Sequence, residues 1–204
     1  MSELKEALEQ LDYWLFDNYP DLFESLSPGL TKEQIEEECD RLLFDISEDV
    51  RDFYLWKNGA NSIFYSTYCG EVLVFPFHKA VDLTIDLTGG GYVTDLLESK
   101  QINSAFFMFD EFERWLHFVG CRGQNTSPVL ILSDDDYIRL THTSLTSLVL
   151  TTLECYEEEV LTFNEFGYIH LNNREDYQLI FAKYNADQDN IREQYGDSID
   201  IYLK

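Results

Sequence analysis

Apolar side chains recur at helical spacing near the start of the chain. Four leucines fall on one face of the predicted helix: Leu4, Leu8, Leu11 and Leu15. Ser2 comes just before them, and its hydroxyl can accept one of the backbone N–H groups that a first helical turn leaves free. Pro20 and the Ser-Pro-Gly stretch at residues 27–29 then interrupt the pattern. The pattern predicts a first helix that buries its leucine face.

Two further helices are predicted before residue 60. Thr31 and Gln34 have the spacing of a capping box, in which each side chain bonds the backbone N–H of the other. The inner face of the helix that follows is predicted to consist of Ile35, Cys39, Leu42 and Leu43. Ser47 can cap the next helix, to which four residues supply bulk: Val50, Phe53, Tyr54 and Trp56. Asn58 and Gly59 predict its end, because glycine tolerates the left-handed conformation that follows many helices.

After Gly59 the helical pattern gives way to short aromatic and β-branched segments. Five segments predict strands: residues 62–68, 72–77, 105–109, 115–121 and 129–132. The first two are expected to form a hairpin or a pair of adjacent strands around Cys69 and Gly70, and residues 78–87 a short helix. The glycines at residues 89–91 lack the other residues of a phosphate-binding loop, so we interpret them as a turn.

The last third of the chain adds two helices. One is predicted after Ser144 and has an acidic end at residues 157–159, and the other is predicted at residues 174–184. Residues 160–171 between them predict strand or irregular structure. Helices thus come first, then strands, then helices again. This order predicts an α+β fold with a mostly antiparallel sheet.

The net charge of the chain restricts its possible functions more than its length does. The 204 residues, enough for one domain, carry 14 Lys and Arg against 39 Asp and Glu, a formal net charge of −25. Such a surface repels nucleic-acid backbones and anionic lipids, so we expect neither as a partner. It suits either a protein that binds a basic partner or simply a very soluble protein. The chain begins without the features of a signal peptide and has no apolar run near the roughly 20 residues of a membrane helix, so the expected location is cytoplasmic.

Candidate chemistry is sparse. Four widely spaced cysteines predict reduced, mostly buried thiols: Cys39, Cys69, Cys121 and Cys155. Four histidines lack metal-binding spacing: His78, His117, His142 and His170. Cys121 and His117 could form a nucleophile pair, because they would lie on one face of a strand. They would still be roughly 13 Å apart along the strand, too far for a hydrogen bond. Consecutive Asp134, Asp135 and Asp136 are typical of a polar turn rather than a calcium loop. We therefore expect no catalytic residue, cofactor or metal.

The segment before the first strand carries a family resemblance. A Pro28-Gly29 lead precedes the capped helix, Ile46-Ser47 opens the next one, and that helix ends as Trp56-Lys57-Asn58-Gly59. This arrangement resembles the SUKH superfamily, which includes the yeast Smi/Knr glucan-synthesis regulators and many bacterial relatives. The order of the later elements is also similar, so the resemblance covers roughly residues 2–159. Ile46-Ser47 stands where the family usually has Leu-Pro, and the region past Val160 has no counterpart there.

The resemblance implies a twisted antiparallel sheet covered by helices. It implies a SUKH-like domain at residues 1–159, with residues 160–204 as an extension packed on or near it. Three motif residues are expected to be structural: Trp56, Asn58 and Gly59. Many bacterial relatives look like immunity proteins that bind and neutralise a cognate toxin, often a nuclease or deaminase. The yeast relatives look like regulatory scaffolds.

The charge and the resemblance lead to one functional expectation. A nuclease or deaminase attracts phosphates with a basic face, which an acidic protein can cover. We expect a non-catalytic cytoplasmic immunity protein with a basic protein partner, and a regulatory scaffold is the alternative. The binding surface should be acidic with embedded aromatic side chains, since Tyr and Trp are enriched among interface anchors. Six residues are candidates for it: Asp134, Asp135, Asp136, Glu157, Glu158 and Glu159.

Overall fold

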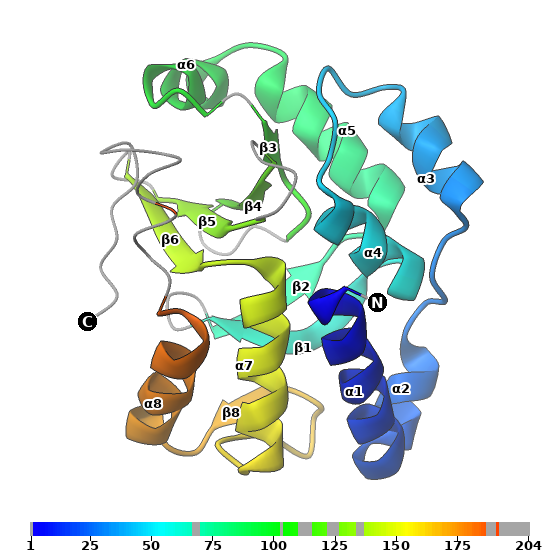
Figure 1. The fold of residues 1–204 in the computed structure, drawn as a ribbon, viewed down its shortest axis with the longest axis vertical. Coiled ribbons are helices and arrows are strands. Elements are labelled where there is room, and N and C mark those ends of the chain that lie inside the picture. The colour runs from blue at the N-terminus through cyan, green and yellow to red at the C-terminus, as the bar shows by residue number, and fades with distance from the viewer. Residues whose placement is uncertain are drawn as a thin grey trace.

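The structure is a computed structural model that describes residues 2–66, 70–102, 104–109, 116–121, 127–133, 137–186 and 191. Helices and strands follow the order seen in Figure 1. The first half of the chain contains α1 (Glu3–Asn18), α2 (Pro20–Ser25), α3 (Lys32–Cys39), α4 (Glu48–Trp56), β1 (Ala60–Ser66), β2 (Gly70–Val74), α5 (Phe77–Thr88) and α6 (Tyr92–Ser99). The second half contains β3 (Ala105–Phe106), β4 (Leu116–Gly120), β5 (Val129–Leu132), β6 (Ile138–His142), α7 (Leu145–Glu157), β7 (Leu161–Phe163), β8 (Ile169–Leu171) and α8 (Arg174–Tyr184).

The strand pairs of the described residues are all antiparallel. β3, β4, β5 and β6 lie in this order in one sheet, and β1–β2 and β7–β8 form two-stranded sheets. A bridge between Val74 and Phe109, with a 2.8 Å hydrogen bond from the Phe75 amide to the Met108 carbonyl, joins the β1–β2 hairpin to the segment after β3. The predicted α+β class with a mostly antiparallel sheet is therefore confirmed.

The four-stranded sheet is buried on both faces. Successive side chains of a strand point to opposite faces, and Phe118 and Val119 of β4 accordingly belong to different hydrophobic clusters. Val119 packs in the larger cluster, which holds the leucine face of α1 and residues of α4 and α7. Phe118 packs in the smaller cluster with Leu97 of α6. Helices thus pack against both faces, and α1 and α7 lie side by side (Figure 1).

The capping residues predicted for the first helices perform that role. Ser2 and Ser47 accept backbone amides from the first turns of α1 and α4, at 3.3 and 3.4 Å. Thr31 and Gln34 form both bonds of the capping box at the start of α3. These bonds satisfy backbone donors that the helix itself leaves free, so local sequence fixes where the helices begin.

The predicted inner face of α3 is wrong at its C-terminal end. α3 ends at Cys39, and Leu43 is 98% exposed, although Leu42 stays partly buried against the core. The chain tightens here because the amides of Arg41 and Leu42 bond carbonyls three residues earlier. Such short-range bonds rotate the following side chains away from the face that an α-helix would present.

The strand predicted at residues 105–109 is shorter in the structure. β3 ends at Phe106, and the Met108 amide bonds the Phe106 carbonyl at 3.1 Å in a tight turn that takes the chain out of the sheet. Three elements were not predicted at all: α2, α6 and β6. α6 follows Gly91 and, like α2 and α5, has no side-chain cap, so it lacks the start signal of α1, α3, α4, α7 and α8.

The described residues after position 159 share the core of the rest of the chain. α8 has the predicted bounds and packs against α7, and its Tyr177 and Ile180 belong to the larger hydrophobic cluster. Beyond α8, the Asn185 side-chain oxygen accepts the amide of Thr143 at 2.9 Å. The described part of the predicted extension, residues 160–186 and 191, thus shares its core with residues 1–159. Across the described ranges, no helix is both long enough and apolar enough to span a bilayer.

Candidate functional site

The family-like motif ends α4 and holds the chain around it. Gly59 has a φ of 91°, and a Cβ there would meet the Val74 carbonyl oxygen at 2.9 Å. The Asn58 side-chain oxygen accepts the amide of Phe77 at 2.8 Å, which ties the end of α4 to the start of α5. The Trp56 ring packs edge-on against Phe53, 5.4 Å between centroids. These contacts hold the backbone and the core side chains in place. The three motif residues therefore have structural roles.

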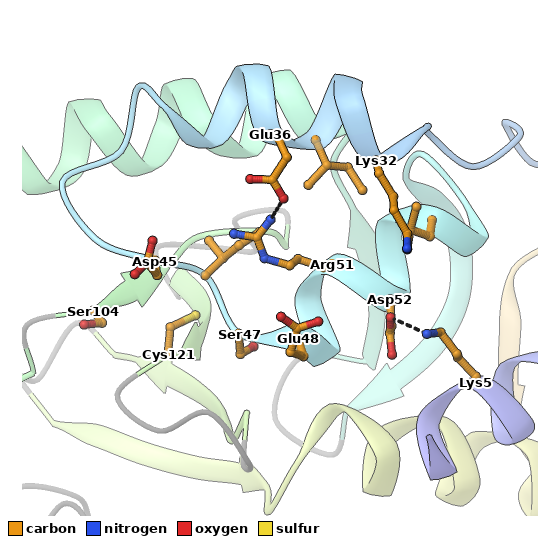
Figure 2. A pocket seen from close by; sticks show the side chains of 13 residues that line it. Lys5, Lys32, Glu36, Asp45, Ser47, Glu48, Arg51, Asp52, Ser104 and Cys121 are labelled. Carbon is orange, nitrogen blue, oxygen red and sulfur yellow. Dashed lines mark hydrogen bonds and ion pairs between the residues drawn. The ribbon is translucent and has the colours of Figure 1, made fainter. Parts of the chain in front are cut away.

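A cleft of about 720 Å³ lies between α3 and α4, hereafter the α3–α4 cleft. Figure 2 shows Arg51 reaching from α4 toward Glu36 on α3, with which it forms an ion pair. On the opposite side, Lys5 of α1 pairs with Asp52 at 2.9 Å. Asp52 also accepts the Ser2 hydroxyl at 2.9 Å. The ion pairs across the cleft therefore connect α1, α3 and α4.

Charges in the α3–α4 cleft nearly compensate each other. Three cations line it, Lys5, Lys32 and Arg51, against four carboxylates: Glu36, Asp45, Glu48 and Asp52. This balance differs from the chain as a whole, where acidic residues outnumber basic ones by 39 to 14. Because paired charges in a partly solvated cleft attract one another, they favour a fixed arrangement of the helices over strong attraction of a charged ligand.

Potential nucleophiles of the α3–α4 cleft are held in structural roles. Burial raises the pKa of the Cys121 thiol to about 11, so this thiol stays protonated at neutral pH. Ser47 caps α4 and accepts the hydroxyl of buried Ser127 at 2.6 Å. His117, considered as a partner for Cys121, does not line the cleft, and its ring lies 6.3 Å from that of Phe109. The arrangement supports binding and packing chemistry more than nucleophilic catalysis.

Two histidines are buried without charge near the four-stranded sheet. Burial lowers the pKa of His117 to about 4 and that of His142 to about 3. His142 packs against Phe181 of α8, 5.2 Å between ring centroids, and neither of its ring nitrogens has a hydrogen-bond partner in the described structure. In the same described residues, no group of three or more His, Cys, Asp or Glu side chains is placed to hold a metal ion.

The acidic candidates divide into two sets. Asp134, Asp135 and Asp136 lie outside the described residues. Glu157, Glu158 and Glu159 lie together where α7 ends, all three exposed, with Glu158 as the C-cap. No ion pair to any of these three glutamates occurs among the described residues. They therefore form a patch of uncompensated negative charge.

A second hollow, about 280 Å³, adjoins this acidic patch, hereafter the aromatic groove. Its lining consists of Trp14, Asn18, Tyr19, Tyr156, Glu157, Glu159, Leu161 and Thr162. The Trp14 ring stacks on that of Tyr156 with centroids 4.7 Å apart, and Tyr156 stacks on Phe163 at 5.2 Å. α1, α7 and β7 carry these rings, and the C-terminal ends of α1 and α7 lie on the same side of the molecule (Figure 1). None of the motif residues Trp56, Asn58 or Gly59 lines this groove.

Sequence reasoning identified the glutamates of the aromatic groove and missed its rings. Trp14 lies beside the leucine face of α1, and its stacking partner Tyr156 is more than a hundred residues away in the sequence. One signal was present: Trp14 and Tyr19 flank the end of a helix whose apolar face the leucines already complete. Comparison of the chain with protein-family models gives no match, and comparison with curated proteins gives none either.

Proposed function

We propose that this chain is a non-catalytic cytoplasmic binding protein of SUKH type, an immunity protein that neutralises a basic toxin by direct contact. The observation that carries the proposal is the acidic patch Glu157–Glu159 beside aromatic side chains, in a chain of net charge −25. A toxin that acts on nucleic acid, such as a nuclease or deaminase, needs a basic face to hold phosphates. An acidic surface that covers this face competes with the substrate and blocks the active site.

The net negative charge of the chain speeds the formation of such a complex and favours basic partners over others. Opposite potentials steer diffusional encounter, so an acidic protein meets a basic partner faster than a neutral one would. The uncompensated glutamates at the end of α7 are available for this role, whereas the carboxylates of the α3–α4 cleft are opposed by cations in the same cleft. The patch at α7 is therefore the better candidate for contact with a partner.

Exposed aromatic side chains of α1 and of the β7–β8 turn offer apolar contact area. Tyr13 and Phe16 are exposed on α1, and Phe166 and Tyr168 are exposed between β7 and β8. Aromatic rings offer large contact surfaces at low conformational cost, and alanine scans of interfaces repeatedly find them among the residues that matter most. Aromatic rings set among carboxylates match the surface expected for binding a basic protein.

The test begins with the neighbouring gene product. A tagged form of the chain is purified from its native cells, bound proteins are identified, and each is expressed in a host with and without this chain. The proposal expects one basic protein that is toxic alone and harmless together with this chain. The association rate should fall by about tenfold or more between low and physiological salt. An unrelated acidic protein of similar net charge serves as the control and should give no rescue.

Three results would overturn the proposal. The first is that no captured protein is toxic, or that toxicity persists when this chain is present. The second is capture of several weakly bound partners without rescue, the outcome that a regulatory scaffold predicts. Turnover of a small molecule by the purified chain would equally contradict a non-catalytic role.

A further inference from the structure

We infer that the side of α1 that points away from the core is the docking surface for a basic amphipathic helix of the partner. This side, hereafter the outer face of α1, consists of Glu6, Glu9, Tyr13, Phe16 and Asp17. Its two rings contact apolar side chains of the bound helix, and its carboxylates pair with Lys or Arg beside them. The inference rests on the proposed function in one respect, since it takes the partner to be a basic protein.

The five residues of the outer face share one side of α1 because their spacing follows the helical repeat. Counted from Glu6, they follow one another at intervals of three, four, three and one residues. They thus lie opposite the leucines that α1 buries in the larger hydrophobic cluster, and all five are exposed. The buried side of α1 is therefore complete without them, and their side chains are available to a partner.

The two rings of the outer face are largely open to solvent. Tyr13 is 73% exposed and Phe16 is 57% exposed. The Phe16 ring is supported from one side only, where it packs edge-on against Phe23 of α2 with centroids 5.6 Å apart. A single apolar residue on a surface is ordinary, but two rings three positions apart on one helix offer contact area of the kind that protein interfaces bury.

Charge determines what can cover these rings. Glu6, Glu9 and Asp17 form no ion pair within the described residues. Residues 2–25 carry seven acidic side chains and one basic side chain, Lys5, which already pairs with a carboxylate of α4. A second copy of the chain would bring the same carboxylates face to face, and an anionic lipid surface would be repelled. A basic protein is the occupant that complements this face.

Backbone hydrogen bonding favours a helix as the bound segment. The backbone of α1 is hydrogen-bonded within the helix, so it offers no free edge to which a strand could add. A segment that lies against α1 must satisfy its own backbone N–H and C=O groups, as a helix does. Apolar side chains three or four positions apart on that helix can contact Tyr13 and Phe16, which have the same spacing.

A comparison surface exists on the same chain. Phe166 and Tyr168, in the turn between β7 and β8, are 75% and 59% exposed. Their rings are as open as those of the outer face of α1, but residues 164–168 carry only one carboxylate, Glu165. This turn therefore offers apolar contact without the charge that selects a basic partner, and it serves as the matched control for the rings.

The first experiment uses a designed probe and the intact chain. A helical peptide of about 18 residues, with leucine at every third or fourth position and lysine and alanine elsewhere, is titrated into isotopically labelled protein at physiological salt. NMR should show saturable shifts of the Tyr13 and Phe16 ring signals. The control peptide has alanine in place of leucine and should bind about tenfold more weakly. Equal binding of both peptides, or shifts centred on the β7–β8 turn or on Glu157–Glu159, would overturn the inference.

The second experiment removes the rings and keeps the charge. Tyr13→Ser with Phe16→Ser should weaken binding of the leucine-containing peptide, and of the captured partner, about thirtyfold. Phe166→Ser with Tyr168→Ser should change either affinity by less than about twofold. Tyr13→Ser alone should weaken binding about fivefold, and because Tyr13 is so exposed this loss cannot come from unfolding. Equal losses at the two pairs of rings, or no loss on α1, would show that the outer face is not the docking surface.

The third experiment removes charge and keeps the rings. Glu9→Gln with Asp17→Asn should weaken binding of the peptide and of the captured partner about tenfold at low salt. Glu37→Gln with Glu98→Gln removes the same charge from exposed residues of α3 and α6 and should have little effect. Equal loss in both double variants would mean that net charge alone attracts the partner, and the docking surface would be wrong.

The two proposals fail separately. If the peptide and the captured partner both depend on Tyr13 and Phe16 but that partner is not toxic, the proposed immunity function fails and the docking surface stands. If a basic toxin is bound and neutralised equally well by the Tyr13→Ser, Phe16→Ser chain and by the native chain, the immunity function stands and the docking surface fails.

Discussion

Gly29 shows how one residue can be fixed by a close approach of two backbone segments. Leu30 donates its amide to the Tyr54 carbonyl at 2.9 Å, and Pro28 forms a bridge with Lys57, so this segment lies against the end of α4. A Cβ built on Gly29 would stand 1.9 Å from the Leu55 carbonyl oxygen. From the sequence, the Pro-Gly pair indicates only a break between helices. The structure shows that the glycine is required because any side chain would push the segment off α4.

We predict that Gly29→Ala lowers the free energy of unfolding by about 3 kcal/mol or more, because backbone atoms must move to admit the methyl group. Urea denaturation followed by circular dichroism measures the loss. Gly70→Ala is the matched control, since Gly70 has a φ of 80° but nothing near its absent Cβ. That change should cost only about 1 kcal/mol of left-handed strain. Equal losses at the two positions would contradict the steric explanation.

His142 is a second residue whose surroundings determine a measurable property. It is 1% exposed, and burial keeps its pKa at about 3, well below the ordinary 6.5. Below pH 6.5, His142 therefore binds a proton in the unfolded chain but stays neutral in the folded chain. Stability is fully present above that pH and is lost progressively as the pH falls below it, and His117 contributes in the same direction.

We predict that His142→Leu reduces this loss of stability in acid. Near about pH 5 the buried histidine costs roughly 2 kcal/mol relative to neutral pH, a cost that leucine does not have. Denaturation curves at several pH values measure the difference. His78→Gln is the control because His78 is exposed, and its pH profile should match that of the native chain. An unchanged profile in His142→Leu would show that other groups govern acid unfolding.

At the scale of elements, local signals explain what the sequence reveals about the fold. Helices α1, α3, α4 and α7 begin at capping residues, whose hydrogen bonds involve partners three positions away and so appear directly in the sequence. α2 and α6 have no such cap and were not predicted, whereas α5, also without a side-chain cap, was predicted from the apolar pattern of residues 78–87. β6 was missed because Asp134, Asp135 and Asp136 drew the interpretation toward a turn, although Ile138 and Leu140 alternate as strand residues should.

Some residues of the candidate site can be identified from the local sequence, and others only from packing between distant elements. Three consecutive glutamates after an apolar run are visible in sequence, so Glu157, Glu158 and Glu159 could be named. The rings beside them could not, because Trp14 meets Tyr156 only after α1 packs on α7. Contacts between elements distant in the chain depend on tertiary packing, which a hydrophobic pattern does not specify.

α8 provides the test of whether the last residues belong to the core. Tyr177 is 1% exposed, its ring lies 5.3 Å from that of Tyr65, and it belongs to the larger hydrophobic cluster. We predict that Tyr177→Ala lowers the free energy of unfolding by about 3–5 kcal/mol, as for other buried aromatic residues. Leu179→Ala on the same helix is the control, since Leu179 is 71% exposed and should change stability by no more than about 0.5 kcal/mol. A small effect at Tyr177 would mean that α8 detaches at little cost.

At the scale of the whole molecule, charge opposes the compact state that the core favours. Folding brings 39 acidic side chains closer together against 14 basic ones, and the excess repels itself. Local ion pairs offset part of this, such as Arg51 with Glu36 and Lys5 with Asp52. Each exposed pair contributes at most about 1 kcal/mol, so we expect the long-range repulsion to dominate the response to salt.

We therefore predict that the melting temperature at neutral pH rises as NaCl is raised from about 0.01 M to about 0.15 M, because the screening length shortens from about 30 Å to about 8 Å. Repulsion between distant carboxylates is lost over this range, whereas close pairs such as Lys5 and Asp52, 2.9 Å apart, are screened much less. Calorimetry measures the shift, and KCl should reproduce it because screening does not depend on the identity of the cation. A melting temperature that falls with salt would mean that the ion pairs outweigh the repulsion. In that case the surplus negative charge would be largely neutralised within the fold and less available to attract a basic partner.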